Sequence, residues 1–100
     1  MTTHPMKRVT IVTEALARDP IRRLLAEVGA HGYTIFGVEG SGARGDRPAD
    51  IAEYGNIQVE VILPPAVAER LLGRLAREFF PRYAMIAYED EVRVLRPEKF

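Results

Sequence analysis

The sequence predicts an α+β domain in which a four-stranded antiparallel sheet carries two helices on one of its faces. Two observations support this prediction. Strand-like and helix-like segments follow one another in the order β-α-β, loop, β-α-β, and only 100 residues are available for both units. The hydrophobic fraction of 47% is enough for a globular core. We therefore expect one domain that spans residues 1–100.

The composition narrows the possible functions. Fourteen basic and fourteen acidic residues cancel, so no overall electric field attracts nucleic acid. The chain has no cysteine, which excludes a disulfide framework and a thiolate zinc site. No apolar run has the length of a signal-peptide core or a membrane span, and we expect a cytoplasmic protein.

The first β-α unit is readable from its apolar spacing. Residues 7–13 alternate and are β-branched, which predicts a strand. Asp19 and Pro20 are typical of a helix N-cap and first helical position, and Gly29 or Gly32 offers the end of that helix. Apolar residues at helical spacing lie between these signals: Ile21, Leu24, Leu25 and Val28.

The remaining elements follow the same logic. Residues 33–38 and 55–63 are expected strands, and Pro64-Pro65 ends the second of these and opens a second helix. A last strand is expected over residues 83–95. The apolar stripe of the second helix consists of Val67, Leu71, Leu72, Leu75 and Phe79, and Arg70, Arg74 and Arg77 line its solvated side.

This order of elements is typical of the ferredoxin-like fold, whose sheet has one face without helices. Some strands carry apolar residues on both faces, as Thr10 with Val12 and Ile35 with Val38 indicate. Because a monomer of this size would expose the second face to water, we expect that face to pack against other subunits.

Residues 40–53 lack any apolar period and are expected to form a long loop, of the kind that is often functional. Its start, Gly40 to Gly45, matches the dinucleotide-binding pattern G-x-G-x-x-G. That pattern needs a following helix, whereas Asp46, Arg47 and Pro48 follow here, and no Lys-Ser or Lys-Thr completes a P-loop. Both interpretations are therefore rejected, and the Arg-Gly-Asp adhesion tripeptide is regarded as coincidental.

An anion site remains possible in this loop. Glycines at 40 and 42 allow backbone N–H groups to approach a ligand and form a nest, and Arg44 and Arg47 offer charged forks for phosphate or carboxylate. The alternative is a flexible hairpin tip with solvated charges.

Catalysis has little support in the sequence. His4 and His31 are far apart and match no Ser-His-Asp or metal-binding spacing. The acidic run at 89–91 is interpreted as a solvated strand edge, and Tyr54 as packing at the base of the loop. We therefore expect no catalytic residue, no metal ligand and no enzymatic activity.

The segment Gly32 to Gly42, with the letters GYTIFGVEGSG, resembles the PII signalling proteins. In that family a glycine-x-threonine begins the second strand, and a valine-x-glycine-x-glycine ends it at the root of the long T-loop, here residues 40–53. The likeness covers most of the chain. It implies a ferredoxin-like homotrimer that binds adenine nucleotides in clefts between subunits and signals through the conformation of its T-loop.

One departure from the family pattern points to a subgroup. Many PII proteins grip ATP phosphates with a Gly-Asp-Gly-Lys turn, and the matching region of this chain has neither glycine nor lysine. Four other motifs are similar to the carboxysome-associated PII-like proteins: Gly40-x-Gly42-x-Arg44-x-x-Arg47, Tyr54-x-Asn56-Ile57, Ile86-x-Tyr88 and Leu95-Arg96-x-x-Lys99-Phe100. That subgroup is linked to inorganic-carbon uptake and binds AMP, ADP or cyclic AMP, and one of its members responds to bicarbonate.

The resemblance also implies roles for individual residues. Phosphates would bind at the loop root, and adenine and ribose would lie between the second strand and the last strand of a neighbouring subunit. The implied nucleotide-binding residues are Thr34, Phe36, Gly37, Val38, Gly40, Ser41, Gly42, Arg44, Arg47, Asn56, Ile86, Ala87 and Tyr88. Bicarbonate would be held by Gly42, Arg44 and Asn56.

The expected protein is thus a trimeric, non-enzymatic regulator of bicarbonate uptake, with ADP, AMP, possible ATP or cyclic AMP, and bicarbonate as ligands. Its expected partner is a bicarbonate transporter at the inner membrane. Two alternatives stay open. One is a metal-binding trimer of the ion-tolerance type on the same fold. The other is a small enzyme similar to acylphosphatase, in which Arg44 and Asn56 would surround one anion.

Overall fold

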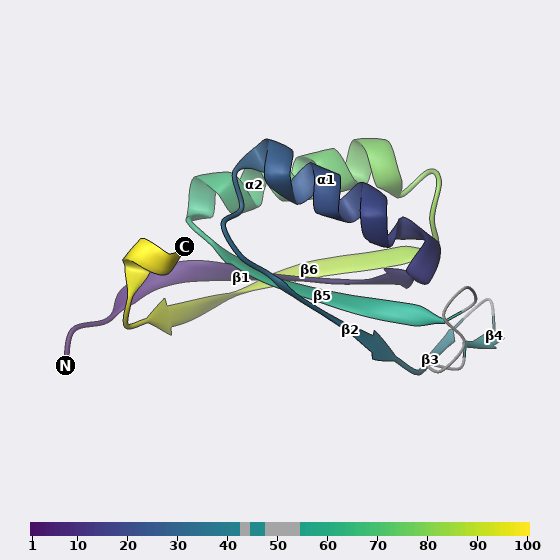
Figure 1. Cartoon of the computed structure of the whole chain (residues 1–100), viewed down its shortest axis with the longest axis horizontal. Helices are drawn as coiled ribbons and strands as arrows, with labels where there is room; N and C mark the ends of the chain where they lie inside the picture. Colours follow the sequence, from purple (N-terminus) through teal and green to yellow (C-terminus); the bar gives the residue numbers. More distant parts are fainter. Residues whose placement is uncertain (43–44, 48–54) are drawn as a thin grey trace.

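A four-stranded sheet forms one layer of the molecule (Figure 1). The structure is a computed structural model that describes residues 1–42, 45–47 and 55–100, with side chains for 1–39 and 55–100. The strands are β1 (His4–Glu14), β2 (Thr34–Val38), β5 (Asn56–Leu63) and β6 (Met85–Val94). They are ordered β2-β5-β1-β6, and every neighbouring pair is antiparallel. This is the strand order of the ferredoxin-like fold, as predicted.

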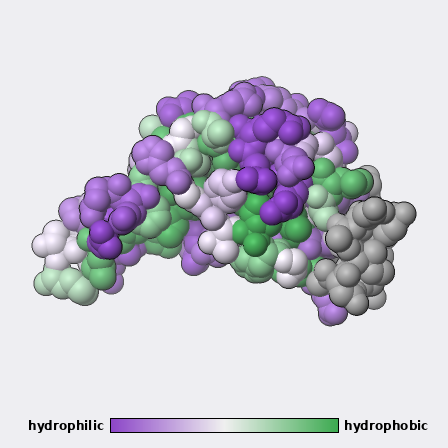
Figure 2. All heavy atoms as spheres, viewed as in Figure 1, coloured by the Kyte–Doolittle hydropathy of each residue, from purple (hydrophilic) through white to green (hydrophobic). Residues whose placement is uncertain are grey.

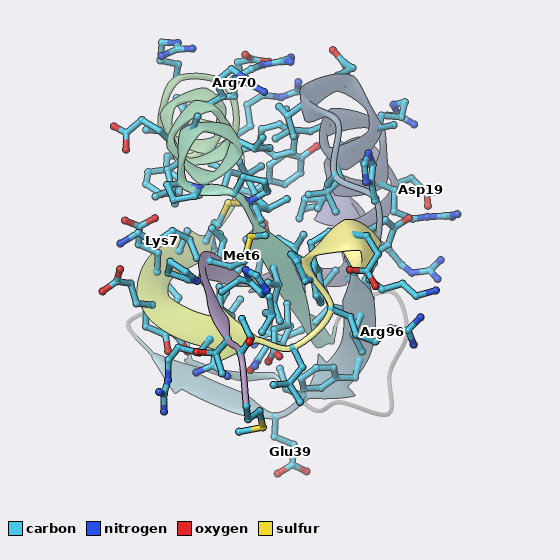
Figure 3. All side chains as sticks on the ribbon, turned by 90° about the vertical axis from the view of Figure 1, so that its left-hand side faces the viewer. Met6, Lys7, Asp19, Glu39, Arg70 and Arg96 are labelled. Atoms are coloured by element: carbon cyan, nitrogen blue, oxygen red, sulfur yellow. The ribbon has the colours of Figure 1, made fainter. Side chains whose placement is uncertain are left out.

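Helices α1 (Arg18–Val28) and α2 (Pro65–Arg74) cover one face of this sheet (Figure 1). Figure 3, viewed from one end, shows the helices side by side, with Arg70 directed away from the sheet and Glu39 on the far side of it. Figure 2 shows hydrophilic side chains along the outer surface of the helix layer. Among residues 1–42, 45–47 and 55–100, no helix covers the second face of the sheet, which agrees with the sequence prediction.

The core lies between the helices and one face of the sheet. Side chains of a strand alternate between faces, so every second residue of β1 and β5 points to the helices. The buried core residues are Val9, Ile11, Ala17, Ile21, Leu24, Leu25, Val28, Ile57, Val59, Val61, Leu63, Ala68, Leu71, Leu75 and Phe79. The alternation in β1 and β5 and the helical stripes therefore have the directions that the sequence predicted.

Helix α1 begins earlier than its sequence signals suggest. A 3-10 turn at Ala15–Ala17 leads directly into the helix, and Ala17 occupies the N-cap position without a side-chain hydrogen bond. Asp19 was expected to be the N-cap, but it lies inside the first turn, where an acid still favours the helix dipole. The prediction was wrong because the chain enters the helix straight from the end of β1. Gly29 ends the helix with a φ of 86°.

Helix α2 begins as predicted, with Pro64 at the N-cap and Pro65 as its first residue. It continues into a π-helical turn, Leu75–Phe79, that the sequence did not reveal. Arg74 was expected to be fully solvated, but its guanidinium donates to Glu78 and also contacts Glu27 of α1 at 3.2 Å. These hydrogen bonds raise the pKa of Arg74, and the hydrogen bonds from Arg74 lower the pKa of Glu78.

The segment predicted as one long loop contains two short strands. β3 (Gly40–Gly42) and β4 (Gly45–Arg47) pair as an antiparallel ribbon, in which Gly40 lies opposite Arg47. Strands of three residues are too short to show an apolar period, so sequence patterns could not reveal them. Arg44, Tyr54 and the rest of residues 43–44 and 48–54 lie outside the described residues.

Candidate functional site

The face of the sheet covered by no described helix, called the open face below, displays six of the thirteen predicted nucleotide-site residues: Thr34, Phe36, Val38, Asn56, Ile86 and Tyr88. Its side chains include Arg8, Thr10, Val12 and Glu14 of β1; Thr34, Phe36 and Val38 of β2; Asn56, Gln58, Glu60 and Ile62 of β5; and Ile86, Tyr88 and Asp90 of β6. These residues share a face because residues directly opposite one another in an antiparallel pair point the same way.

Strand register arranges these side chains in rows that cross the sheet. One row runs from Thr34 through Glu60 and Thr10 to Tyr88. The row nearer the loop runs from Phe36 through Gln58 and Val12 to Ile86. Each row therefore has one predicted residue at each edge of the sheet, with β5 and β1 between them.

The distance between the edge strands β2 and β6 determines whether one ligand can contact both sets of residues within a single chain. Three strand spacings of about 4.8 Å place β2 and β6 about 14 Å apart. Thr34 and Phe36 therefore lie far from Ile86 and Tyr88 of the same chain. The predicted nucleotide-binding residues of β2 and β6 thus lie at opposite edges of one sheet. A ligand that contacts both sets must therefore span the sheet or bind between two subunits.

Large apolar side chains are exposed at both edges. Phe36 is 41% exposed, Ile86 60% and Tyr88 52%. Exposed apolar groups gathered on one face are typical of a binding or assembly surface. This face therefore has the character of an interface.

The root of the loop lies at one end of the same sheet. Val38 at the end of β2 is opposite Asn56 at the start of β5, and Asn56 is opposite Glu14 at the end of β1. The ribbon of β3 and β4 leaves the sheet from this end (Figure 1). The glycines that were expected to form an anion-binding nest lie in β3, so pairing with β4 sets the direction of their N–H groups.

Two predicted residues point to the helix side instead. Gly37 lies opposite buried Ile57, and Ala87 packs against the core. The methyl group of Ala87 is thus directed away from the open face and Gly37 has no side chain, so both residues offer only backbone groups at the sheet edges. Ser41 and Arg47 are placed by their backbone alone, in β3 and β4.

A charged pair occupies the next row of the open face. Arg8 donates two hydrogen bonds to Asp90, of 3.0 and 2.7 Å, across β1 and β6. The hydrogen bonds with Asp90 raise the pKa of Arg8, and those with Arg8 lower the pKa of Asp90. The acidic run at 89–91 is exposed, as predicted for a solvated edge, although Asp90 has this specific partner.

Glu60 is a candidate site residue that sequence reasoning missed. Its half-buried carboxylate lies on the open face directly opposite Thr34, so an acceptor and a hydroxyl adjoin at one edge. The alternation of residues 55–63 did assign Glu60 to the polar side of its strand. That Glu60 lies beside Thr34 follows only from the register in which β2 pairs with β5.

Two kinds of feature, a cluster of metal ligands and a membrane-spanning helix, were sought among the described residues. Among the residues with described side chains, no group of three or more histidine, cysteine, aspartate or glutamate residues could hold a metal ion. Within the described part of the chain, no helix has the length and apolar character needed to cross a membrane.

Comparison with known proteins gives a consistent family assignment. The family model for nitrogen regulatory protein P-II matches residues 6–99. A crystal structure of a putative PII-like signalling protein from Thermus thermophilus is 45% identical, with a TM-score of 0.86, and the match covers 100% of this chain and 99% of that one.

Two solved structures of CPII, a nitrogen regulatory PII-like protein from Thiomonas intermedia K12, are also similar. The form bound to ADP, AMP and bicarbonate is 25% identical with a TM-score of 0.91, and the match covers 99% of this chain and 96% of that one. The form bound to ADP and bicarbonate is 26% identical with a TM-score of 0.90, covering 99% and 97%.

Proposed function

This chain belongs to the nitrogen regulatory protein P-II family, and we propose from this premise that it is a trimeric regulator that binds ADP or AMP between its subunits. Its coarse role as a PII-like regulatory protein follows from the family. The nucleotides, bicarbonate as a second ligand and inorganic-carbon uptake as the regulated process are parts of the proposal. The ligands of CPII support the first two.

The observation that carries the proposal is the division of the site between opposite edges. Thr34 and Phe36 lie on edge strand β2, whereas Ile86 and Tyr88 lie on edge strand β6. In a closed ring of three copies, the β2 edge of one subunit can face the β6 edge of the next. Such a ring completes three equal sites and also covers apolar groups of the open face.

The two edges offer complementary groups for an adenine nucleoside. Glu60 and Thr34 can accept hydrogen bonds, and the exocyclic amino group of adenine is a donor. The exposed ring of Tyr88 and the side chains of Ile86 and Phe36 provide apolar surface for the base and the ribose. These roles add Glu60 to the residues predicted from the sequence.

The loop root would hold the anionic part of the ligands. Backbone N–H groups of Gly40 to Gly42 and the guanidinium groups of Arg44 and Arg47 suit phosphate oxygens. Asn56 lies between Val38 and Glu14 at the same end of the sheet. We assign bicarbonate to Gly42, Arg44 and Asn56, since an amide and a guanidinium can both donate to a small planar anion.

Ligands would act by shifting the populations of loop conformations. The loop, residues 40–53, would then be read by a partner, for which we propose a bicarbonate transporter at the inner membrane. This role needs no chemical step. The protein would therefore be a non-enzymatic sensor. We place its action in the cytoplasm, where the loop could meet the cytoplasmic side of the transporter.

Calorimetric titration of the whole chain with ADP, with and without bicarbonate, tests the proposal. The double variant Arg44→Ala with Arg47→Ala is expected to bind ADP at least tenfold more weakly, about 1.4 kcal/mol, because it lacks both phosphate-binding forks. Arg70→Ala with Arg77→Ala is the matched control. It removes two exposed arginines, one in α2 and one in the π-helical turn that follows it, and its affinity should equal that of the wild type.

Two outcomes would contradict the proposal. Absence of ADP and AMP binding by the wild-type chain would remove the nucleotide function and favour one of the alternatives from the sequence. Equal affinity of the wild type and the Arg44/Arg47 double variant would leave nucleotide binding intact but overturn the assignment of the phosphate site.

A further inference from the structure

The end of β1 connects two parts of the molecule that the proposed function keeps separate. Its last residues, Thr13 and Glu14, lie between the start of β5 and the start of β6. The start of β5 is the returning root of the loop. The start of β6 leads to Ile86 and Tyr88, which form the other half of the proposed nucleotide site.

On the β6 side, two side chains bind the backbone of one residue, Ala84. The Thr13 hydroxyl donates to the carbonyl oxygen of Ala84 at 2.9 Å, and the backbone N–H of Ala84 donates to a carboxylate oxygen of Glu14 at 3.1 Å. Thr13 is only 2% exposed, so the position of its hydroxyl is set by packing. Both backbone polar groups of Ala84 are therefore bound by consecutive residues of β1.

These contacts begin where the backbone ladder ends. The pairing of β1 with β6 runs as far as Thr13 opposite Met85, and Ala84 is the next residue outward. At Ala84 the side chains of Thr13 and Glu14 take the place of backbone hydrogen bonds between the strands. They satisfy the N–H and the carbonyl oxygen of Ala84, which would otherwise bond to water. The direction in which the chain enters β6 is thus fixed by Thr13 and Glu14.

On the β5 side, the same end of β1 holds the loop root through its backbone. Glu14 lies opposite Asn56, and the N–H of Ala15 donates to the carbonyl oxygen of Gly55 at 2.9 Å. Gly55 is buried. Residues 13–15 therefore contact both the returning root of the loop and the residue that leads into β6.

We propose that Glu14 is a positioning residue that couples the loop root to the β6 half of the nucleotide site. The proposal rests on the proposed function. Glu14 holds Ala84 from a strand end that also holds Gly55 and Asn56. A displacement of the loop root thereby reaches Ile86 and Tyr88 through a single hydrogen-bonded step. Glu14 itself needs no contact with the nucleotide.

Two variants separate the hydrogen bond from the charge. Glu14→Gln keeps an oxygen that can accept from the Ala84 N–H but removes the negative charge. Glu14→Ala removes the acceptor and leaves the half-buried N–H without this partner. The control is Glu39→Ala, which removes an exposed acid close to the other root of the loop.

The experiment combines ADP calorimetry with amide hydrogen exchange on the full chain. Glu14→Ala should bind ADP about five- to tenfold more weakly than the wild type, whereas Glu14→Gln and Glu39→Ala should stay within about twofold. In the wild type and in Glu14→Gln, saturating ADP should slow exchange at Ala84 and also at Asn56. In Glu14→Ala, saturating ADP should leave exchange at Asn56 unchanged, which a purely structural role of Glu14 does not predict.

The outcomes distinguish this inference from the function on which it rests. If the wild type binds no ADP, the proposed function is wrong and the inference falls with it. If the wild type binds ADP and Glu14→Ala binds it equally well, only the inference is overturned. Failure of Glu14→Gln to restore affinity would also overturn it, since the hydrogen bond would then not be the relevant property.

Discussion

At the scale of single residues, two glycines near the end of α1 have different roles. Gly29 ends the helix with a φ of 86°, in the left-handed region that residues with a Cβ avoid. Gly32 has no such φ, and a Cβ added at either position would meet no atom within 4 Å. The sequence offered both glycines as the end of the helix, and backbone conformation distinguishes them.

Gly29→Ala should therefore destabilise the protein by about 1–2 kcal/mol through backbone strain alone. Gly32→Ala is the matched control and should change the free energy of unfolding by less than about 0.5 kcal/mol. Urea denaturation followed by circular dichroism measures both values. Equal changes in the free energy of unfolding for the two substitutions would contradict the explanation by backbone strain at Gly29.

At the scale of the elements, stability comes from the packing of two amphipathic helices on one face of the sheet. Leu25 of α1 is fully buried among the core residues, whereas Leu16, in the 3-10 turn before α1, is 68% exposed. Both residues are leucines in the same connection between β1 and β2. Their contributions should differ because only one of them is removed from water.

Leu25→Ala should lower the free energy of unfolding by about 2–5 kcal/mol, because it creates a cavity between α1 and the sheet. For Leu16→Ala we expect a change of less than about 0.5 kcal/mol. Thermal and urea unfolding of both variants provide the measurement. A large effect at Leu16 would instead indicate that this side chain is covered in an assembly.

At the scale of the whole molecule, the proposed site depends on how the copies assemble. The two half-sites lie at opposite edges of the open face, and a ring of three chains would join them. Light scattering should then give a mass three times the 11.2 kDa of one chain. A monomer mass at micromolar concentration would remove the assembly and the shared site together.

Mixed assemblies test whether the site is shared. A β2 variant, Thr34→Ala with Phe36→Ala, and a β6 variant, Ile86→Ala with Tyr88→Ala, should each lose most ADP binding. After the two variants are unfolded and refolded together, about one quarter of the sites should be intact, since random mixing joins an unaltered β2 edge to an unaltered β6 edge at that frequency. Calorimetry of the mixture measures the recovered fraction. Recovery of no sites would mean that both edges act within one chain.

Much of the fold could be read from local patterns along the chain. Alternation predicted β1, β5 and β6, residues 33–38 were also expected to form a strand, and Pro65 and the apolar stripes predicted both helices. The order of elements predicted the antiparallel sheet with helices on one face, and the comparisons confirm the family resemblance. Local signals failed where the chain departs from regular elements. Asp19 was wrongly expected to cap α1, and the short β3 and β4 were missed.

The sequence by itself determined which residues alternate, which face of each helix is apolar and where glycines and arginines gather near the loop. Only the tertiary structure decided that Glu60 lies opposite Thr34 and that Glu14 holds Ala84. It also decided that the two halves of the proposed site lie at opposite edges of the sheet. The reason is physical: periodicity is a local property of the chain, whereas register and strand order arise from pairing between residues far apart in sequence.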